Sequence, residues 1–258
     1  SFLNALYGRA VDQGKIHLDT TLNELHFEQY SRISHEEGEA RISDLLKSRS
    51  GVYLEAGEES LSMRRQRPKR GAYEPDTHFY YNNWDFNALG FIYNLQTESD
   101  LFRDFKQHIA DPLGMEDFSL ESTWYQQESD PVKFPSYLFR VSARDMARFG
   151  QLYLQEGAWQ GRQIVPGDWI QDSRSVYTPS SASSIYGYGY LWWVADKGYL
   201  ANRNLYSAIG RYGQSIDILP DDNIVFVHRV DSDSWINRFF RHVSTAQRLK
   251  LLRKIIEA

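Results

Sequence analysis

The stretch "QSIDILPDDNIVFVHR", residues 214–229, decides the fold class of this chain. Runs rich in β-branched and aromatic residues, the composition of β-strands, lie on either side of Pro220-Asp221-Asp222. Tight turns favour proline and aspartate, because proline fixes φ and aspartate bonds to its own backbone. The stretch therefore predicts two antiparallel strands joined by a hairpin turn.

Strands of similar composition precede this hairpin, and a helix follows it. We expect strands in "YGYGYLWWVA" at 186–195 and in "LYSAIG" at 205–210, which extend the hairpin into an antiparallel meander. The segment "STAQRLKLLRKIIEA", residues 244–258, has the apolar spacing of an amphipathic helix. The C-terminal part is thus predicted to be a meander closed by a helix.

The N-terminal part is predicted to be mainly helical. Residues 1–19 show helical apolar spacing with Gly14 as a C-terminal cap, and Ser43 is placed to cap a short helix ending at Leu46. Residues 54–78 are expected to form a long loop. Further helices are expected at 84–99, 100–115, 142–157 (with Ser142 and Asp145 in a capping box) and 165–175. Helices, then a meander, then a helix indicate an α+β fold rather than a doubly wound α/β fold.

The composition argues against several classes of protein. The 258 residues carry a net charge of −5, which disfavours a nucleic-acid partner, and the basic run "RRQRPKR" at 64–70 is interpreted as a solvated loop. No apolar run is long enough to predict a membrane span. The absence of cysteine excludes thiolate nucleophiles, disulfides and cysteine metal sites. The 7 histidines show no metal-binding spacing, so no metal site is expected. His228 lies in a predicted strand and is expected to be structural, whereas His242 lies near the C-terminal helix and could reach a cleft.

A cluster of tyrosine and asparagine marks the candidate site. In "FYYNNWDFNALG", residues 79–90, a loop turns into a helix. Two pairs fit the pattern Tyr-x-Asn, namely Tyr80 with Asn82 and Tyr81 with Asn83. On the residues alone, a packed tyrosine and a helix-capping asparagine are the simpler interpretation.

Over nearly its whole length, the chain resembles the serine β-lactamase and penicillin-binding-protein superfamily, in its class C-like esterase and amide-hydrolase branch. Besides the Tyr-x-Asn stretch, the resemblance rests on segments in the family's order: 6–25, 44–52, 109–115, 142–154, 186–193 and 207–220. It implies one β-lactamase-like domain over 1–258, with an antiparallel sheet flanked by helices. A mainly helical lobe is expected at about 20–175, and a sheet-associated lobe at 1–19 and 176–258, with the first strands of the fold upstream of this chain.

The resemblance also implies a nucleophile outside the given residues. The family carries it in Ser-x-x-Lys, and the register places the lysine immediately before Ser1. No serine here is followed by lysine three residues later, although Ser43 and Lys47 are four apart. The catalytic serine and its lysine are therefore expected upstream, on the same chain or on a separate N-terminal segment that completes the fold. Without them, the fragment is expected to expose a sheet edge and to aggregate.

Within the chain, Tyr81 and Asn83 are implied as catalytic residues. This register is preferred because the family's Leu-Gly then falls at Leu89 and Gly90. A phenol has a pKa near 10, but a neighbouring lysine ammonium makes the phenolate accessible. Tyr81 would then take the serine proton and later activate water, while Asn83 would hydrogen-bond the lysine and the substrate.

The family's third motif, a basic residue, a small residue and glycine, falls on Ala208-Ile209-Gly210 and lacks the basic residue. This departure argues for an ester or amide other than a β-lactam that carries a carboxylate. Gly210 would allow close approach of the substrate, and the backbone N–H of Arg211 would complete an oxyanion hole. Gln214 and Trp192 are further candidates for substrate binding, and Tyr188, Tyr190 and Trp193 are weaker candidates for lining the cleft.

The function implied is that of a bacterial serine hydrolase. It would cleave a small-molecule ester or amide through an acyl-serine intermediate without metal or cofactor. Two alternatives stay open: a penicillin-recognising-type domain that binds without turnover, and, less favoured, an aromatic-rich carbohydrate-binding module. The resemblance slightly favours a periplasmic or secreted location, and the substrate is not specified.

Overall fold

The structure is a computed structural model that describes residues 1–127, 134–231, 234 and 243–257. Backbone packing divides the chain into two units. The sheet unit comprises Ser1, Ala110–Phe118 and Val141–Ala258, and the helical unit comprises Phe2–Ile109 and Ser119–Arg140. The two units have other boundaries than the two lobes expected from the sequence. The division into those lobes stays a prediction.

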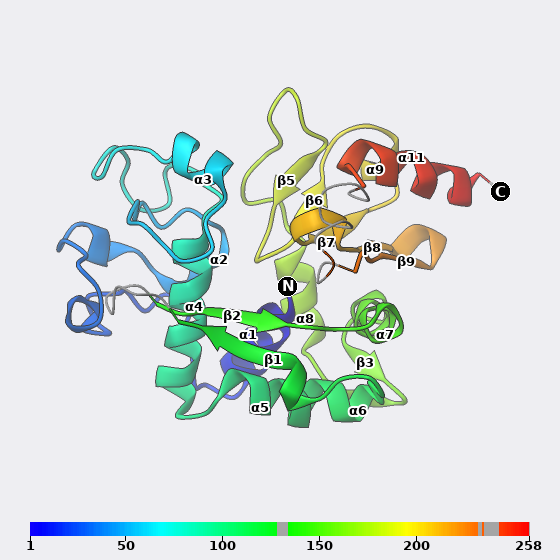
Figure 1. Cartoon of the computed structure of the whole chain (residues 1–258), viewed down its shortest axis with the longest axis horizontal. Helices are drawn as coiled ribbons and strands as arrows, with labels where there is room; N and C mark the ends of the chain where they lie inside the picture. The colour runs from blue at the N-terminus through cyan, green and yellow to red at the C-terminus, as the bar shows by residue number, and fades with distance from the viewer. Residues whose placement is uncertain (128–133, 232–233, 235–242, 258) are drawn as a thin grey trace. The chain divides into compact units, whose positions relative to one another are not determined.

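The sheet unit is built on a five-stranded sheet in the order β5-β6-β7-β8-β9 (Figure 1). Every neighbouring pair is antiparallel, which confirms the meander and the α+β class. Leu219 pairs with Ile224 across the predicted turn, whose residues Pro220–Asp222 form one 3-10 turn. The strands are β5 (Tyr186–Tyr188), β6 (Trp193–Ala195), β7 (Tyr206–Ile209), β8 (Ser215–Leu219) and β9 (Ile224–His228).

The segment predicted as one strand at 186–195 is a hairpin of β5 and β6. The chain reverses between them, with Leu191 in the left-handed region at φ 58°. The N–H of Gly189 donates to the carbonyl of Trp192 at 2.9 Å across this turn. The prediction was wrong because the aromatic residues continue through the turn and hide it.

The two faces of β8 pack against different helices. Successive side chains of a strand point to opposite faces. Ile216 lies against Gly150 of α7 (Ala143–Leu154), where an added Cβ would come within 2.8 Å of the isoleucine. Leu219 lies in a core cluster with Leu252 of α11 (Thr245–Ile256), the predicted C-terminal helix. Helices therefore cover both faces of the sheet.

The two helices differ at their N-caps, and the capping box predicted for α7 is only partly formed. Ser244 and Gln247 form a reciprocal capping box at the start of α11. Ser142 caps α7 by accepting from the N–H of Asp145 at 3.2 Å. The expected return bond from Asp145 is replaced, because its carboxylate accepts from the N–H of Asp117 at 3.0 Å and pairs with Arg148. The remaining elements of the unit are α6 (Asp111–Leu113), β3 (Ala158–Trp159), β4 (Arg162–Gln163), α8 (Gly167–Ser173) and α9 (Gly198–Ala201).

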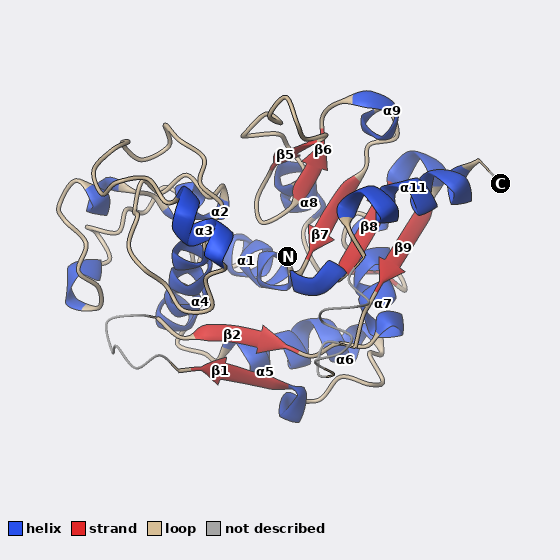
Figure 2. Cartoon of the chain, turned by 45° about the horizontal axis from the view of Figure 1, so that its top comes forward, coloured by secondary structure: helices blue, strands red, loops and turns tan. Residues whose placement is uncertain are grey.

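The helical unit is organised around one long helix, α4 (Asn83–Thr97), which contacts α1, α2, α5 and β2 (Figure 2). The Tyr7 hydroxyl donates to the carbonyl of Leu89 at 2.8 Å, and a Cβ on Gly90 would come within 2.5 Å of the Tyr137 ring. The Leu-Gly pair thus lies in the tightly packed middle of the unit. Its other elements are α1 (Phe2–Asp12), α2 (Ile42–Leu46), α3 (Leu61–Gln66), α5 (Leu101–Phe105), β1 (Thr123–Gln126) and β2 (Ser136–Phe139).

Several local predictions for this part of the chain need correction. The expected loop at 54–78 contains the helix α3, and the small β1–β2 sheet was not predicted. Arg41, rather than Ser43, is the N-cap of α2, because the Asp44 carboxylate turns back to accept from the Arg41 N–H at 2.9 Å. The helix expected at 100–115 is interrupted by a π-helical turn at Lys106–Ala110.

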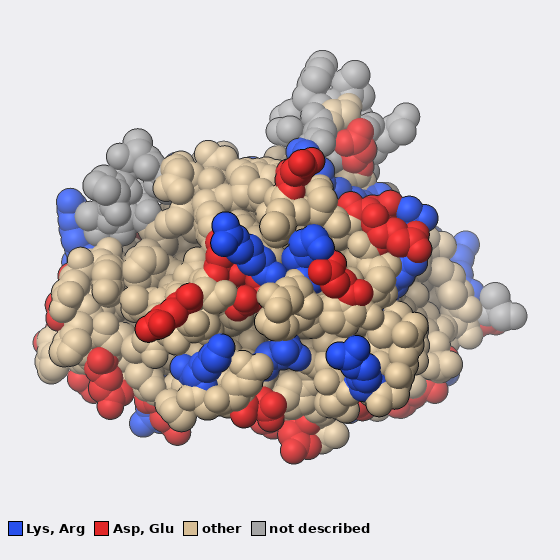
Figure 3. Space-filling model, turned by 90° about the horizontal axis from the view of Figure 1, so that it is seen from below, with Lys and Arg blue, Asp and Glu red and all other residues tan. Residues whose placement is uncertain are grey.

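The basic run at 64–70 is not simply solvated. Arg67 pairs with the almost completely buried Glu59, and Arg70 binds Glu37 with two bonds of 2.8 and 2.7 Å. Cationic and anionic side chains are also interspersed on the face shown in Figure 3. Arg67 and Arg70 therefore form ion pairs with other segments of the helical unit.

In the described part of the chain, no helix combines the length and the apolar character that a membrane span requires.

Candidate active site

The structure distinguishes the two overlapping Tyr-x-Asn pairs. Asn82 is the N-cap of α4: its side-chain oxygen accepts from the N–H of Asp85 at 2.8 Å, and its amide donates to the carbonyl of Tyr80 at 2.6 Å. The Tyr80 hydroxyl donates to the carbonyl of Met63 at 2.8 Å. Both residues are buried. Tyr80 and Asn82 therefore have structural roles, which favours the pair Tyr81 and Asn83 as the functional one.

Tyr81 and Asn83 flank this cap and are each partly exposed. The Tyr81 ring packs edge-on against Phe86, with 4.9 Å between the ring centroids. Asn83 is the first residue of α4, and its amide donates to the carbonyl of Gly57 at 3.0 Å. A backbone carbonyl thus orients the amide that is predicted to face the substrate.

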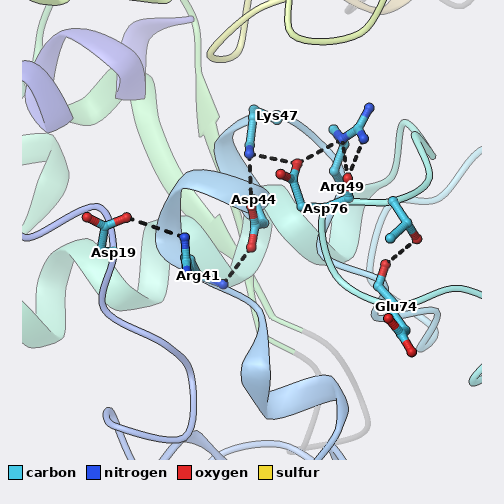
Figure 4. Close-up of polar contacts among 8 residues, drawn as sticks. Asp19, Arg41, Asp44, Lys47, Arg49, Glu74 and Asp76 are labelled. Atoms are coloured by element: carbon cyan, nitrogen blue, oxygen red, sulfur yellow. Dashed lines mark hydrogen bonds and ion pairs between the residues drawn. The ribbon is translucent and has the colours of Figure 1, made fainter.

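Ion pairs between buried and half-buried side chains hold the segment 76–80, which precedes Tyr81, against residues 44–49. Lys47, which is 8% exposed, binds Asp44 at 2.9 Å and Asp76 at 2.7 Å, and Arg49 binds Asp76 at 2.9 Å (Figure 4). Partial burial raises the pKa of Asp76, but hydrogen bonds and charges from Lys47 and Arg49 outweigh this effect and lower the pKa. We call these four residues the Asp76 clamp.

Backbone bonds strengthen the same connection. The N–H of Asp76 donates to the carbonyl of Arg49 at 2.8 Å, and the N–H of Tyr80 donates to the carbonyl of Ser48 at 3.0 Å. The segment 76–80 is therefore held along the segment 48–49 at both ends. The sequence showed the charges but could not show this pairing, because the partners are about thirty residues apart.

In the sheet unit, the predicted oxyanion residues lie in the turn between β7 and β8. The N–H of Gly210 donates to the carbonyl of Gln214 at 2.8 Å and closes the turn. Tyr212 and Gly213 both have positive φ, at 64° and 88°. A left-handed tyrosine is a strained conformation of the kind that gathers at functional sites. The Arg211 guanidinium lies over the Tyr212 ring, 5.0 Å from its centroid.

A histidine and the Gln214 side chain support this turn. The Nδ1 atom of His228 lies 2.7 Å from the carbonyl of Gly213, so the structural role predicted for His228 has a defined partner. The Gln214 amide binds the backbone of Val230 twice, at 2.8 and 3.0 Å. Gln214 is therefore a support of the turn, rather than the substrate ligand that the sequence suggested.

Trp192 lies in the core. It is 0% exposed and packs among Phe149, Tyr153 and Tyr206, with ring centroids 4.8 Å apart for Tyr153 and 5.2 Å apart for Tyr206. The hairpin turn before β6 directs this side chain inward, which strand alternation alone did not predict. Trp192 is therefore too deeply buried to bind substrate, and the prediction that it does so was wrong. Tyr188 and Tyr190 are also buried, at 3% and 8% exposed.

The candidate residues are distributed over both units. Tyr81 and Asn83 belong to the helical unit, and Gly210, Arg211 and Gln214 belong to the sheet unit. The Ser1 hydroxyl donates to the carbonyl of Leu191 at 2.7 Å within the sheet unit. Among the described residues, no group of three or more metal-binding side chains is gathered in one place. His242, which the sequence places near the C-terminal helix, lies outside the described residues.

Comparison with known proteins identifies the family. The profile of the family described as Beta-lactamase matches residues 1–241. The chain therefore belongs to the beta-lactamase family, and the β-lactamase-like fold expected from the sequence is confirmed. A protein of Alkalihalophilus pseudofirmus without a described function is 29% identical over 121 residues, which cover 43% of this chain and 35% of that protein. The aligned part of the chain thus spans about a third of that relative's length.

Solved structures share the fold at low sequence identity. A Bacillus anthracis protein whose name proposes a 6-aminohexanoate-dimer hydrolase has a TM-score of 0.73 and 21% identity, with 99% of this chain and 70% of that one covered. A D-alanine carboxypeptidase from Burkholderia cenocepacia has a TM-score of 0.62 and 16% identity, with 88% and 75% covered. A class C beta-lactamase mutant has a TM-score of 0.63 and 14% identity, with 99% and 80% covered. These neighbours share the β-lactamase-like fold with this chain.

Proposed function

We propose that the protein hydrolyses an ester or amide through an acyl-serine intermediate, with the nucleophilic serine and its lysine supplied by a segment that precedes Ser1. The observation that carries the proposal is the assignment of Tyr81 and Asn83. Their neighbours Tyr80 and Asn82 are buried, whereas Tyr81 and Asn83 are partly exposed at the start of α4. Membership of the beta-lactamase family and the names of the structural neighbours support the same class of reaction.

The reaction would proceed in two steps. In the first step, the serine hydroxyl attacks the substrate carbonyl, Tyr81 as phenolate accepts its proton, and that proton passes to the leaving alcohol or amine. In the second step, water gives a proton to Tyr81 and attacks the acyl-serine ester. That proton passes to the serine oxygen as the acid is released, which restores both the serine and the Tyr81 phenolate. The lysine charge keeps the phenolate accessible, and Asn83 orients the lysine and the substrate.

The turn at Gly210–Gln214 would stabilise the oxyanion. The backbone N–H of Arg211, with that of the serine, would donate to the negatively charged oxygen of the tetrahedral intermediate. Gln214 and His228 act on the reaction only by holding this turn through Val230 and Gly213. Because Ala208 replaces the family's basic residue, the substrate is an ester or amide that needs no cation at this position.

The test uses the full-length protein and compares two single changes. We expect Tyr81→Phe to lower the rates of phosphonylation by a fluorophosphonate and of ester hydrolysis by about 10²- to 10⁴-fold, because the acid–base group is lost. The matched control is Tyr80→Phe, which removes the hydroxyl that binds Met63. It should leave both rates within a few-fold.

The opposite ranking of the two variants would contradict the assignment of Tyr81. A full-length chain that forms no adduct and hydrolyses no ester or amide would contradict the hydrolase proposal itself. In that case, saturable binding of a penicillin without turnover would support the alternative, a penicillin-recognising-type binding domain.

A further inference from the structure

A buried carboxyl group lies two residues beyond Asn83 and has no role in the reaction described above. Asp85 is 0% exposed in the first turn of α4. An acidic residue here usually faces solvent or the helix cap, where it interacts favourably with the helix dipole. Asp85 instead points into the unit, where the Ser50 hydroxyl donates to its Oδ1 atom at 2.6 Å.

Ser50 connects this carboxyl group to a second segment. Its hydroxyl oxygen accepts from the N–H of Val52 at 3.1 Å while it donates to Asp85. Gly51, between them, has φ 73°, and a Cβ there would come within 3.0 Å of the Tyr73 carbonyl oxygen and of the Pro75 nitrogen. The Ser50-Gly51 turn therefore packs directly on the backbone that leads into the Asp76 clamp.

The surroundings of Asp85 favour its neutral form. Its Oδ2 atom is buried and has no hydrogen-bond partner among the described residues. Burial raises the pKa of Asp85 to about 8; hydrogen bonds from Ser50 and Asn82 lower it, and the Asp44 carboxylate raises it further. This raised pKa favours the neutral carboxylic acid, which can stay buried without a counter-ion.

The other titratable groups near Asp85 do not neutralise a negative charge there. Asp44 of α2 repels it, and the nearby Lys47 is already bound to Asp44 at 2.9 Å. Burial raises the pKa of the Tyr53 and Tyr80 phenols, and a charge on Asp85 contributes further to each rise. An ionised Asp85 would therefore have to draw water into the first turn of α4.

We propose that Asp85 is a positioning residue, which as a neutral acid joins the Ser50 turn to the first turn of α4 and thereby holds Tyr81 and Asn83 in place. Ionisation of this group loosens the first turn and displaces Tyr81. Its consequence for catalysis rests on the proposed hydrolase function, whereas its effect on the position of Tyr81 does not.

The experiment therefore has a structural readout and a catalytic one, both on the full-length chain. Ring-¹³C-tyrosine is incorporated, and the Tyr81 resonance is assigned by its absence in Tyr81→Phe. In the unchanged protein this resonance should move as the pH rises from neutral to alkaline. In Asp85→Asn, which keeps a neutral acceptor for Ser50, the resonance should not show this transition.

Turnover is measured over the same pH range. Hydrolysis by the unchanged protein should fall about tenfold per pH unit once Asp85 ionises, and Asp85→Asn should lack this component of the decline. Ser50→Ala should lower kcat at every pH with little change in KM, because the link is weakened but no charge is involved. Asp104→Asn is the matched control: Asp104 also accepts from hydroxyls, those of Tyr93 and Ser99 at 2.7 Å, and should leave the pH profile unchanged.

The outcomes test the positioning role of Asp85 and the hydrolase function separately. If the Tyr81 resonance ignores pH, or titrates equally in Asp85→Asn, the positioning role is overturned. If the resonance responds as expected but the full-length chain hydrolyses no ester or amide, the positioning of Tyr81 stands and only the hydrolase function fails.

Discussion

Arg248 and Asp217 form an ion pair that is almost completely removed from water. Arg248 of α11 is 3% exposed and Asp217 of β8 is 0% exposed. The second guanidinium nitrogen donates to the Tyr186 hydroxyl at 3.2 Å, and Asp217 also accepts from Ser207 at 2.6 Å. The pair therefore ties the last helix to three strands of the sheet through a hydrogen-bonded polar network.

Loss of the arginine should be costly because Asp217 would be left buried and unpaired. We expect Arg248→Met to lower the free energy of unfolding by about 3–5 kcal/mol, measured by urea denaturation. Arg253→Ala is the control on the same helix, since its ion pair with Glu257 is exposed; it should cost less than about 1 kcal/mol. Equal effects of the two changes would mean that the buried network contributes nothing specific.

The two adjacent asparagines of the candidate site should separate stability from activity. Asn82→Ala removes the N-cap of α4 and should lower the free energy of unfolding by about 0.5–2 kcal/mol. Asn83→Ala should change stability far less, yet reduce ester hydrolysis more than Asn82→Ala does. Thermal unfolding and steady-state kinetics of both variants check this, and a reversed order would assign the functional role to Asn82.

The Asp76 clamp should weaken in acid. The pKa of Asp76 is lowered in the folded state, so its stabilisation is present above the ordinary carboxyl pKa and is lost as the pH falls through the lower, folded value. Asp76→Asn should therefore lower the Tm at neutral pH, and the difference from the unchanged protein should shrink as the pH falls below the ordinary carboxyl pKa. The effect should be modest, since the Asp76 side chain is 56% exposed. A difference that does not depend on pH would contradict the ion pairing.

Asp85 should show the opposite dependence on pH. Its pKa of about 8 in the folded state exceeds the ordinary carboxyl value, so the folded protein binds more protons than the unfolded chain between about pH 4 and about pH 8. Stability should fall through this range because of Asp85 and then level off. Asp85→Asn should remove that slope, so that its Tm exceeds that of the unchanged protein most clearly at pH 8 and above. Parallel curves of Tm against pH would show that Asp85 is ionised in both states.

Gly213 in the candidate oxyanion turn should tolerate no side chain. Its φ is positive, and an added Cβ would come within 2.8 Å of the Val243 carbonyl oxygen. Gly71 also has positive φ but nothing within 4 Å of such a Cβ, so Gly71→Ala measures the cost of backbone strain alone. We expect Gly213→Ala to lower both Tm and kcat more than Gly71→Ala, and equal effects would show that Val243 yields without consequence.

The order of elements could be predicted from local sequence, whereas pairing between distant segments could not. The hairpin at Pro220–Asp222 and the helix start at Ser244 have strong local signals, and the structure confirms both. The turn at Leu191 lies within a run of aromatic residues that hides it, and the prediction that Trp192 binds substrate was wrong because this side chain is buried.

The candidate site also depends on contacts between distant segments that the local sequence does not predict. The pattern around residues 80–83 indicated two overlapping pairs, but only the bonds of Tyr80 and Asn82 favour one of them. Burial of Asp85 against Ser50 depends on a partner 35 positions away, so no local pattern could indicate a neutral acid at this point.

Neither unit is one continuous piece of chain, because the backbone passes between them after Ser1, Ile109, Phe118 and Arg140. A single cut in the gene cannot separate one unit from the other, because residues 110–118 of the sheet unit lie between two segments of the helical unit. Changes to this protein in evolution should therefore accumulate as substitutions and short loop insertions rather than as exchange of whole modules.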